Sequence, residues 1–158
     1  VEQISVDANR NQAIYATAGL PVFGDNLEGF QGPLSGILTA LERSETDFVL
    51  FVPCDSPFFP DNLLEKLKSA VVFHGVSIAY VHDGEREHPT FCLMARSLKE
   101  KLAAYLATGE RRMLQFMRQN GAVSVDFSEN KQAFTNINTL ADLTYFNQQK
   151  DFSGFIAK

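Results

Sequence analysis

Five consecutive apolar residues at positions 48–52 (Phe-Val-Leu-Phe-Val) constrain the fold of this chain more than any other segment. β-Branched and aromatic residues without polar alternation are typical of a strand buried on both faces, as in a parallel sheet covered by helices. Such sheets bind ligands at the carboxyl ends of their strands. Asp55 follows this strand between two prolines, so it is placed to hold a divalent cation against a phosphorylated ligand. Alternatively, Asp55 or Ser56 only caps the turn before Pro57.

Strand and helix patterns alternate over most of the chain. Strands are predicted at 1–7, 21–23, 48–52, 76–81, 90–94, 123–127 and 134–137, and helices at 10–18, 33–41, 63–70, 98–106, 112–118 and after Thr139. Asp61 is the expected N-cap of the 63–70 helix, and the spacing of Thr139 and Asp142 predicts a capping box for the last one. Alternation without repeats or linkers predicts one α/β domain over residues 1–158. Because residues 76–94 resemble an antiparallel pair, we expect a mixed sheet.

Composition excludes several classes of function. The net charge of −5 and the pI of about 5.1 argue against an extended nucleic-acid surface. No apolar run approaches the roughly 20 residues that a membrane span needs. Cys54 and Cys92 lie in apolar, strand-like segments and are expected as buried thiols rather than a disulfide. These features predict a cytoplasmic protein that binds neither nucleic acid nor a membrane.

Two motifs suggest contacts with a polar ligand. Residues 32–36 (Gly-Pro-Leu-Ser-Gly) form a glycine-bounded loop that enters a helix, where backbone can approach a ligand closely. The same pattern is also ordinary punctuation at a helix start. Asn136 and Asn138 lie two residues apart and would face one side of a strand, which suits recognition of hydroxyls, phosphate or a heterocycle. Alternatively, Asn138 and Thr139 merely begin the last helix.

Two charged segments complete the set of motifs. Residues 83–90 place four charges and a histidine between two strands, a pattern typical of a solvated hairpin. Arg111 and Arg112 are adjacent cations at a helix start, usually a surface feature, although a ligand phosphate could bind there.

In their order along the chain, these segments resemble the molybdenum cofactor guanylyltransferase (MobA) family. The resemblance covers nearly the whole sequence, and the 82–90 and 109–112 segments are its most specific parts. It rests on residues 7–10 (Asp-Ala-Asn-Arg), 24–25 (Gly-Asp), 32–36, 53–57 (Pro-Cys-Asp-Ser-Pro), 82–90 (His-Asp-Gly-Glu-Arg-Glu-His-Pro-Thr), 109–112 (Gly-Glu-Arg-Arg), 126–128 (Asp-Phe-Ser) and 136–139 (Asn-Ile-Asn-Thr). The fold it implies is a Rossmann-like nucleotidyltransferase with a central, mostly parallel sheet flanked by helices.

The resemblance also implies an activity and a division of the site. The family transfers GMP from GTP to molybdenum-molybdopterin, with Mg²⁺ as cofactor, and so forms the molybdopterin guanine dinucleotide cofactor with release of pyrophosphate. It implies Asp55 as the catalytic metal ligand. The GTP side would comprise Asp7, Asn9, Asp25 and Asp55, and the molybdopterin side Gly32, Gly36, Arg111, Arg112, Asn136 and Asn138. Ser35, Cys54 and His88 lie in family motifs but receive no role.

The sequence departs from the family pattern in two ways. The family opens with a strand and a glycine-rich phosphate loop with a lysine, and this sequence has neither. We therefore expect a first strand, a phosphate loop and a first helix to precede Val1 in the protein. Asp7 also stands where some members carry an asparagine implicated in guanine nucleotide binding.

Other functions and partners follow from these observations. The alternatives are a sugar-phosphate or other small-molecule nucleotidyltransferase, and a catalytically inactive nucleotide-binding module. Beyond the two substrates, the resemblance implies molybdenum-insertion proteins and molybdoenzyme chaperones as partners.

Overall fold

A computed structural model describes residues 3–8, 22–23, 33–53, 59–134, 142–148 and 152–157, with side chains described over 34–52 and 59–134. The strands are β1 (Gln3–Ala8), β2 (Val22–Phe23), β3 (Phe48–Pro53), β4 (Ile78–His82), β5 (Glu87–Ala95), β6 (Val123–Asp126), β7 (Asp142–Gln148) and β8 (Phe152–Ala157). The helices are α2 (Pro33–Arg43), α3 (Leu63–His74), α4 (Lys99–Ala107), α5 (Met113–Gln119) and α6 (Lys131–Phe134), with short 3₁₀ turns η1 (Arg96–Leu98) and η2 (Ser128–Asn130).

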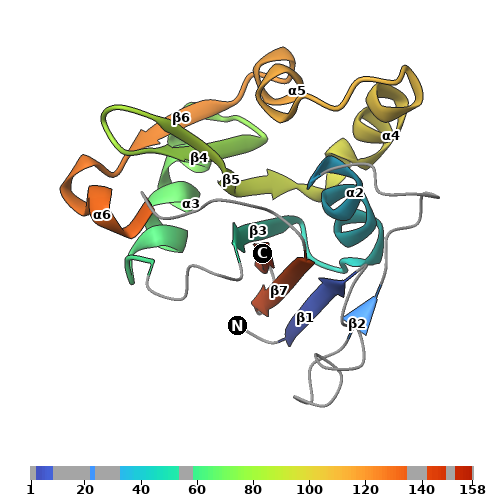
Figure 1. Cartoon of the computed structure of the whole chain (residues 1–158), viewed down its shortest axis with the longest axis horizontal. Coiled ribbons are helices and arrows are strands. Elements are labelled where there is room, and N and C mark those ends of the chain that lie inside the picture. Colours follow the sequence, from blue (N-terminus) through green and yellow to red (C-terminus); the bar gives the residue numbers. More distant parts are fainter. Residues whose placement is uncertain are drawn as a thin grey trace.

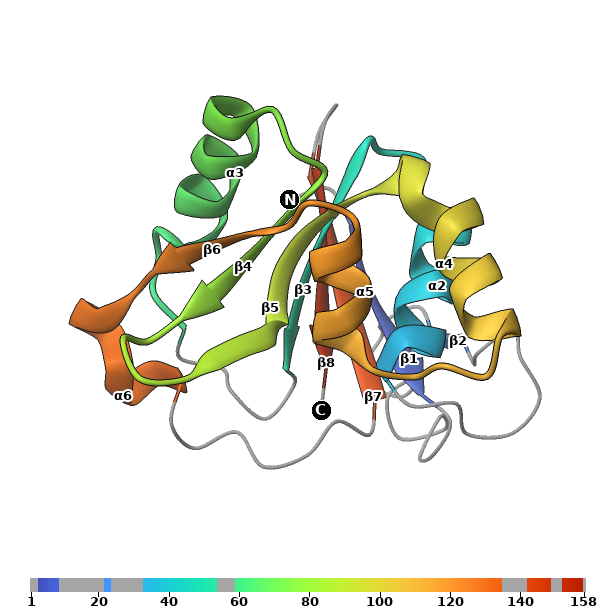
Figure 2. The same ribbon diagram turned by 90° about the horizontal axis from the view of Figure 1, so that it is seen from above.

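The described strands form one mixed sheet, with helices against both faces (Figures 1 and 2). Their order is β2-β1-β7-β8-β3-β5-β4-β6. Three pairings are parallel and five are antiparallel, yet six strands run in the same direction, because only β5 and β7 are reversed. The predicted α/β fold with a mixed sheet and flanking helices is therefore confirmed, as is the antiparallel pairing within 76–94.

The core has two layers, one on each face of β3. Val49 and Phe51 pack with α2, α4 and α5, whereas Leu50 and Val52 pack with α3 and α6. All four side chains are at most 5 % exposed, which confirms that residues 48–52 form a strand buried on both faces. This burial explains why the run carries no polar residue.

The C-terminal part differs from the sequence expectation. Phe134 ends α6 instead of opening a strand, and the region after Asp142 forms β7 and β8 instead of a helix. β7 pairs with β1 over 142–147 and contacts β3 at 143–145, while β8 pairs with β3 over 152–154. These ladders satisfy backbone groups along two strand edges, which outweighs the local capping signal.

Smaller differences follow from tertiary packing. Asp61 is not the cap of α3, since Asn62 occupies that position without a side-chain cap bond. Phe127 lies beyond β6 and is 1 % exposed, packed in the α3 layer. The predicted helix at 10–18 lies outside the described residues. No helix in the described part of the chain is long and apolar enough to cross a membrane.

Candidate functional site

The topology brings the ends of several elements to one edge of the sheet. β1, β2, β3, β4 and β6 all finish there because they share one direction, and β5 and β7 begin there because they run the other way. Pro53, the last residue of β3, pairs with Leu143 near the start of β7, and His82 at the end of β4 pairs with Glu87 at the start of β5. We call this the ligand edge, since strand ends of α/β sheets form the usual binding crevice.

Six of the predicted site residues lie outside the described residues: Asn9, Asp25, Gly32, Asp55, Asn136 and Asn138. Their neighbours in the sequence are nevertheless elements that meet the ligand edge. β2 ends two residues before Asp25, and β3 ends two residues before Asp55. Asp7 belongs to β1, where its backbone pairs with Phe23 and Leu143. Cys54 is also outside the described part.

The start of α2 carries the glycine motif. Pro33 is the first helical residue, where its missing N–H is not needed. Ser35 is 1 % exposed, and its carbonyl accepts a hydrogen bond of 3.0 Å from the Thr39 hydroxyl. Gly36 is also buried. The predicted helix start is therefore confirmed, while contact with a ligand stays a prediction.

The two adjacent arginines before α5 have different surroundings. Arg111 donates from Nη1 to the carbonyls of Leu106 (2.8 Å) and Glu110 (2.7 Å), so it closes the end of α4. Arg112 instead pairs with Glu110 through Nη2 and Oε2 at 3.0 Å, and its side chain is 72 % exposed. An exposed pair of this kind stabilises little. The carbonyl of Arg112 accepts a 2.9 Å hydrogen bond from the Tyr105 hydroxyl, which fixes the backbone there.

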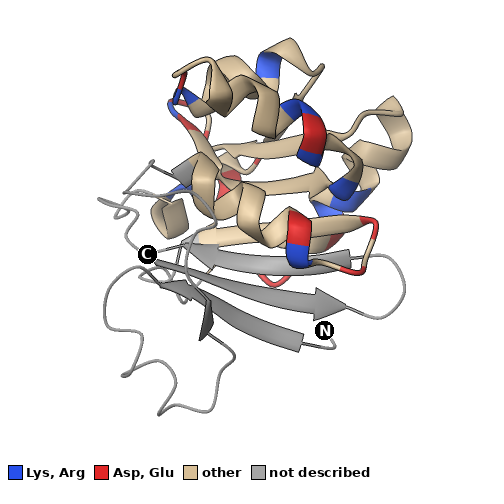
Figure 3. Ribbon diagram, turned by 90° about the vertical axis from the view of Figure 1, so that its right-hand side faces the viewer, with Lys and Arg blue, Asp and Glu red and all other residues tan. Residues whose placement is uncertain are grey.

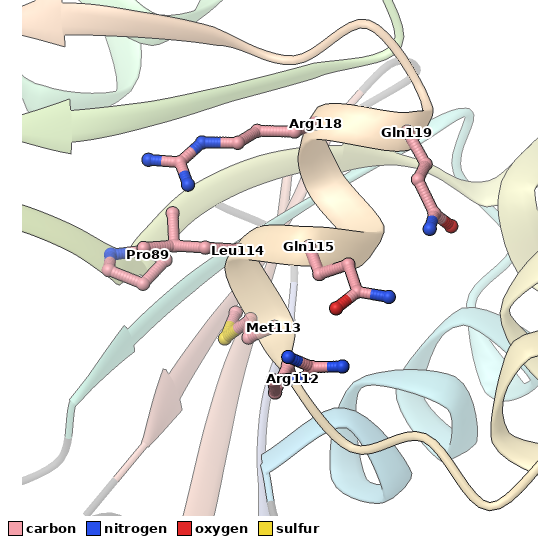
Figure 4. Close-up of a pocket in the computed structure, with 7 residues that line it drawn as sticks. All are labelled: Pro89, Arg112, Met113, Leu114, Gln115, Arg118 and Gln119. Atoms are coloured by element: carbon pink, nitrogen blue, oxygen red, sulfur yellow. The ribbon is translucent and has the colours of Figure 1, made fainter.

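A groove of about 810 Å³, partly lined by Arg112, lies between α5 and β5 (Figure 4). Arg118 and Leu114 extend toward Pro89, whereas Gln115 leaves the other side of α5. Arg118 is held by an ion pair of 2.6 Å with Glu87. The lining residues are Pro89, Arg112, Met113, Leu114, Gln115, Arg118 and Gln119.

A hydrogen-bonded network underlies the rim of this groove. Glu87 accepts a hydrogen bond of 2.8 Å from the Tyr80 hydroxyl on one carboxylate oxygen and pairs with Arg118 through the other. These bonds, that of Tyr80 foremost, hold the pKa of the Glu87 carboxyl below its usual range against the effect of partial burial. Burial is also the main cause that raises the pKa of the Tyr80 hydroxyl. The network ties α5 to the start of β5.

The turn between β4 and β5 contains a buried carboxylate that sequence reasoning missed. Asp83 is 1 % exposed, and its Oδ1 accepts hydrogen bonds of 2.8 Å from both the Glu85 and Arg86 amides. Its Oδ2 lies 2.8 Å from Nε2 of His88. The His88 bond, joined by those of the two amides, holds the pKa of the Asp83 carboxyl well below its usual range although burial opposes this.

This arrangement corrects the interpretation of residues 83–90 as wholly solvated. Gly84, Glu85 and Arg86 are exposed, but Asp83 is buried and the His88 side chain is 14 % exposed. The Asp-Gly pair at 83–84 was a usable signal, since an aspartate that opens a tight turn commonly bonds the backbone amides that follow it. The partner histidine five residues later could not be inferred from that rule.

Charges on the described surface are mixed rather than segregated. Figure 3 shows basic and acidic positions interspersed over the helices, without an extended basic area in the part of the chain it colours. The described residues likewise contain no group of three or more His, Cys, Asp or Glu side chains placed to hold a metal ion. The predicted metal ligand, Asp55, is not among them.

Comparisons with known proteins identify the family. The family model described as "MobA-like NTP transferase domain" matches residues 1–123. The molybdenum cofactor guanylyltransferase of Mannheimia succiniciproducens is 70% identical over 143 residues, which are 90% of this chain and 75% of that protein. The protein of the same name from Haemophilus influenzae is 62% identical, over 90% of this chain and 74% of its own length.

Solved structures support the same fold. Molybdopterin-guanine dinucleotide biosynthesis protein A from Archaeoglobus fulgidus superposes with a TM-score of 0.66 at 22% identity, covering 83% of this chain and 69% of that one. A protein from Aquifex aeolicus gives a TM-score of 0.67 at 19% identity, covering 82% and 68%. At such identities the likeness shows the fold alone. The sequence matches go further, and the chain belongs to the MobA-like nucleotidyltransferase family.

Proposed function

We propose that this protein transfers GMP from GTP to molybdenum-molybdopterin and so forms the molybdopterin guanine dinucleotide cofactor. The observation that carries the proposal is 70% identity over 90% of the chain to a relative named molybdenum cofactor guanylyltransferase. In this reaction a terminal phosphate oxygen of molybdopterin attacks the α-phosphorus of GTP. The bond from that phosphorus to the oxygen bridging the β-phosphate breaks, and pyrophosphate leaves.

The protein's contribution is positioning and neutralisation of charge, as in other phosphoryl and nucleotidyl transfers. Family membership implies a divalent metal, and we propose Mg²⁺ held by Asp55, because carboxylate oxygens are the ligands that this ion prefers. Bound there, the ion would neutralise charge on the triphosphate. Asp7, Asn9 and Asp25 would contact GTP. In support of this assignment, Asp7 belongs to β1, and β7 pairs with both β1 and β3, the strand that leads to Asp55.

The second substrate would bind farther along the ligand edge. We assign Gly32, Gly36, Asn136 and Asn138 to molybdopterin, with Arg112 as the partner of its phosphate. The exposed guanidinium of Arg112 and its exchangeable pair with Glu110 support this choice. Arg111 is already engaged with two carbonyl groups, so we give it the structural task of closing α4. A cytoplasmic location and contacts with molybdenum-insertion proteins and molybdoenzyme chaperones belong to the same proposal.

The test is direct transfer by the purified protein. GTP and CTP are each incubated with molybdopterin and Mg²⁺, and the dinucleotide product and pyrophosphate are quantified by mass spectrometry and a coupled assay. We expect product with GTP, little with CTP, and none after removal of divalent ions with EDTA until Mg²⁺ is restored. Equal transfer from CTP would contradict the guanylyltransferase assignment. Binding of GTP without transfer would instead support an inactive nucleotide-binding module.

A further inference from the structure

The end of the β4–β5 hairpin packs against the segment formed by η2 and α6. Just before that segment, the Phe127 amide donates a hydrogen bond of 2.8 Å to the His82 carbonyl. Glu85 and Lys131 form an ion pair of 2.5 Å between Oε1 and Nζ. A Cβ atom on Gly84 would lie only 3.1 Å from Cβ of Ser128, so the two backbones approach closely. The hairpin end and α6 therefore form one packed unit at the ligand edge.

His88 lies at the centre of this unit. Its ring is bonded through Nε2 to Asp83 and packs on Phe134, with ring centroids 5.7 Å apart and planes 30° apart. Asp83 is itself fixed by two backbone amides. A buried carboxylate is destabilising unless its oxygens are hydrogen-bonded, and here three donors contact them. The orientation of the His88 ring is thus set from both sides.

Phe134 connects His88 to the predicted second-substrate site. It is fully buried, and its ring also packs against those of Phe91 and Phe127, with centroids 4.7 Å and 5.6 Å away. It is the last residue of α6. Asn136 and Asn138 follow it in the sequence after two and four residues, so the place where α6 ends fixes where the chain enters their segment.

We propose that Asp83 and His88 form a positioning pair for molybdopterin binding: His88, oriented by Asp83, sets the end of α6 and thereby the entry of the chain into the segment that carries Asn136 and Asn138. His88 acts through Phe134 and is a positioning residue, not a catalytic one. This inference rests on the proposed function, because it assigns the two asparagines to molybdopterin. It explains a buried, hydrogen-bonded pair that the transfer step itself does not use.

A purely structural role makes a different prediction. If the pair only stabilised the hairpin, its loss would lower stability and affect both substrates to the same extent. A positioning role would affect the two substrates differently, since the predicted GTP residues follow β1, β2 and β3 rather than α6. The affinity for molybdopterin should then fall while the affinity for GTP is kept.

The experiment compares three variants with the unmodified protein. His88→Leu removes the hydrogen bond to Asp83, whereas His88→Gln retains an amide donor of similar reach. Thr46→Val is the control of matched destabilisation, and Thr46 lies at the opposite edge of the sheet. Thr46 is 7 % exposed, and its hydroxyl forms hydrogen bonds with the Ser44 hydroxyl (2.9 Å) and the Phe48 carbonyl (3.0 Å). Dissociation constants for molybdopterin, under anaerobic conditions, and for GTP are measured by titration calorimetry.

We expect His88→Leu to weaken molybdopterin binding at least fivefold while GTP binding stays within twofold. His88→Gln should recover most of the loss, and Thr46→Val should leave both constants within twofold despite a similar fall in Tm. Hydrogen exchange in peptides spanning residues 128–138 should rise in His88→Leu and return toward normal in His88→Gln.

Three results would overturn the inference. These are unchanged molybdopterin binding in His88→Leu, an equal loss for both ligands, and a glutamine variant no better than leucine. If His88→Leu does not fold, hydrogen exchange and molybdopterin binding are compared between His88→Gln and Asp83→Asn instead. We then expect tighter molybdopterin binding in His88→Gln than in Asp83→Asn, and equal affinities would overturn the inference. Failure of the unmodified protein to bind molybdopterin would remove the proposed function, and this inference with it.

Discussion

Replacing Asp83 should destabilise the fold by an amount that its hydrogen bonds allow to be estimated. Asp83→Ala removes three hydrogen bonds of 2.8 Å from a side chain that is 1 % exposed. Loss of one partner of a buried pair typically costs about 3–5 kcal/mol. The lower end applies here, because Glu85 and Arg86 are exposed and water can replace the bond to their amides. We therefore expect a loss of about 3 kcal/mol, or a fall of about 6–12 °C in Tm for a domain of this size.

Asp83→Asn separates charge from shape. The amide oxygen can still accept from the two backbone amides, so the change mainly weakens charge-assisted hydrogen bonds, which contribute about 1.5–3 kcal/mol when one partner is ionised. We expect a loss of about 1.5 kcal/mol in the free energy of unfolding near neutral pH. The free energy of unfolding of Asp83→Asn should thus lie between those of the unmodified protein and Asp83→Ala.

The difference between the unmodified protein and Asp83→Asn should depend on pH. The pKa of Asp83 is lowered by folding, whereas an unfolded aspartate has a pKa of about 3.9. The stabilisation is therefore complete above about pH 4 and is lost as the pH falls further toward the folded pKa. As the pH falls from 5 to 3.5, the gap should narrow.

Urea unfolding of both proteins at pH 7, 5 and 3.5, followed by circular dichroism, measures this gap. Equal m-values at each pH would show that the same transition is compared. Two results would refute the account of Asp83 as a buried carboxylate stabilised by its partners. These are an Asp83→Asn variant as stable as the unmodified protein at pH 7, and a stability gap that widens between pH 5 and pH 3.5.

Four further predictions concern single residues. Asp55→Asn should leave circular dichroism unchanged but slow GMP transfer about a hundredfold, a loss of about 3 kcal/mol; normal turnover at saturating Mg²⁺ would reduce Asp55 to a turn cap. Asn138→Ala should weaken molybdopterin binding severalfold in calorimetry, with GTP affinity near normal; the reverse result would contradict the division of the site. Gly84→Ala should lower the free energy of unfolding by about 1–2 kcal/mol in urea titrations, because φ is +95° and the added Cβ would lie 3.1 Å from Cβ of Ser128. The thiol of Cys92, whose pKa burial raises, should resist alkylation in the native protein, and rapid labelling in peptide maps would show that it is accessible.

The elements that sequence patterns predicted well are those whose signal is local. The apolar positions of α2 fall at 34, 37, 38 and 41, and all four are buried in the structure. The run at 48–52 needs no knowledge of its partners to be recognised as a strand, because both of its faces are apolar. The α/β class followed from this alternation of patterns.

The C-terminal part shows where local reasoning fails. The spacing of Thr139 and Asp142 is a capping-box signal, but residues 142–148 contain Leu143, Tyr145 and Phe146, which suit a strand. The choice depends on whether partner strands are available. Of those partners, β3 lies 90 or more residues earlier in the sequence and β1 more than 130 residues earlier. No local pattern contains that information.

The candidate site shows the same limit. Most of the sequence motifs follow strands that run in one direction. They did not distinguish Arg111 from Arg112, because the difference is that Arg111 donates to carbonyls at the end of α4. They also left His88 without a role, because its partner Phe134 is 46 residues away.

The two reversed strands explain why candidate residues occur both after and before strands. In a purely parallel sheet, only carboxyl ends reach the ligand edge, as for Phe23 in β2 and Pro53 in β3. Reversal of β5 brings its first residues, including His88, to that edge, and reversal of β7 does the same for Asp142 and Leu143. Each reversed strand therefore adds a polar segment without a further crossover helix. This arrangement would let one sheet serve two substrates, with the nucleotide at the forward strands and the second substrate at the entries to the reversed ones.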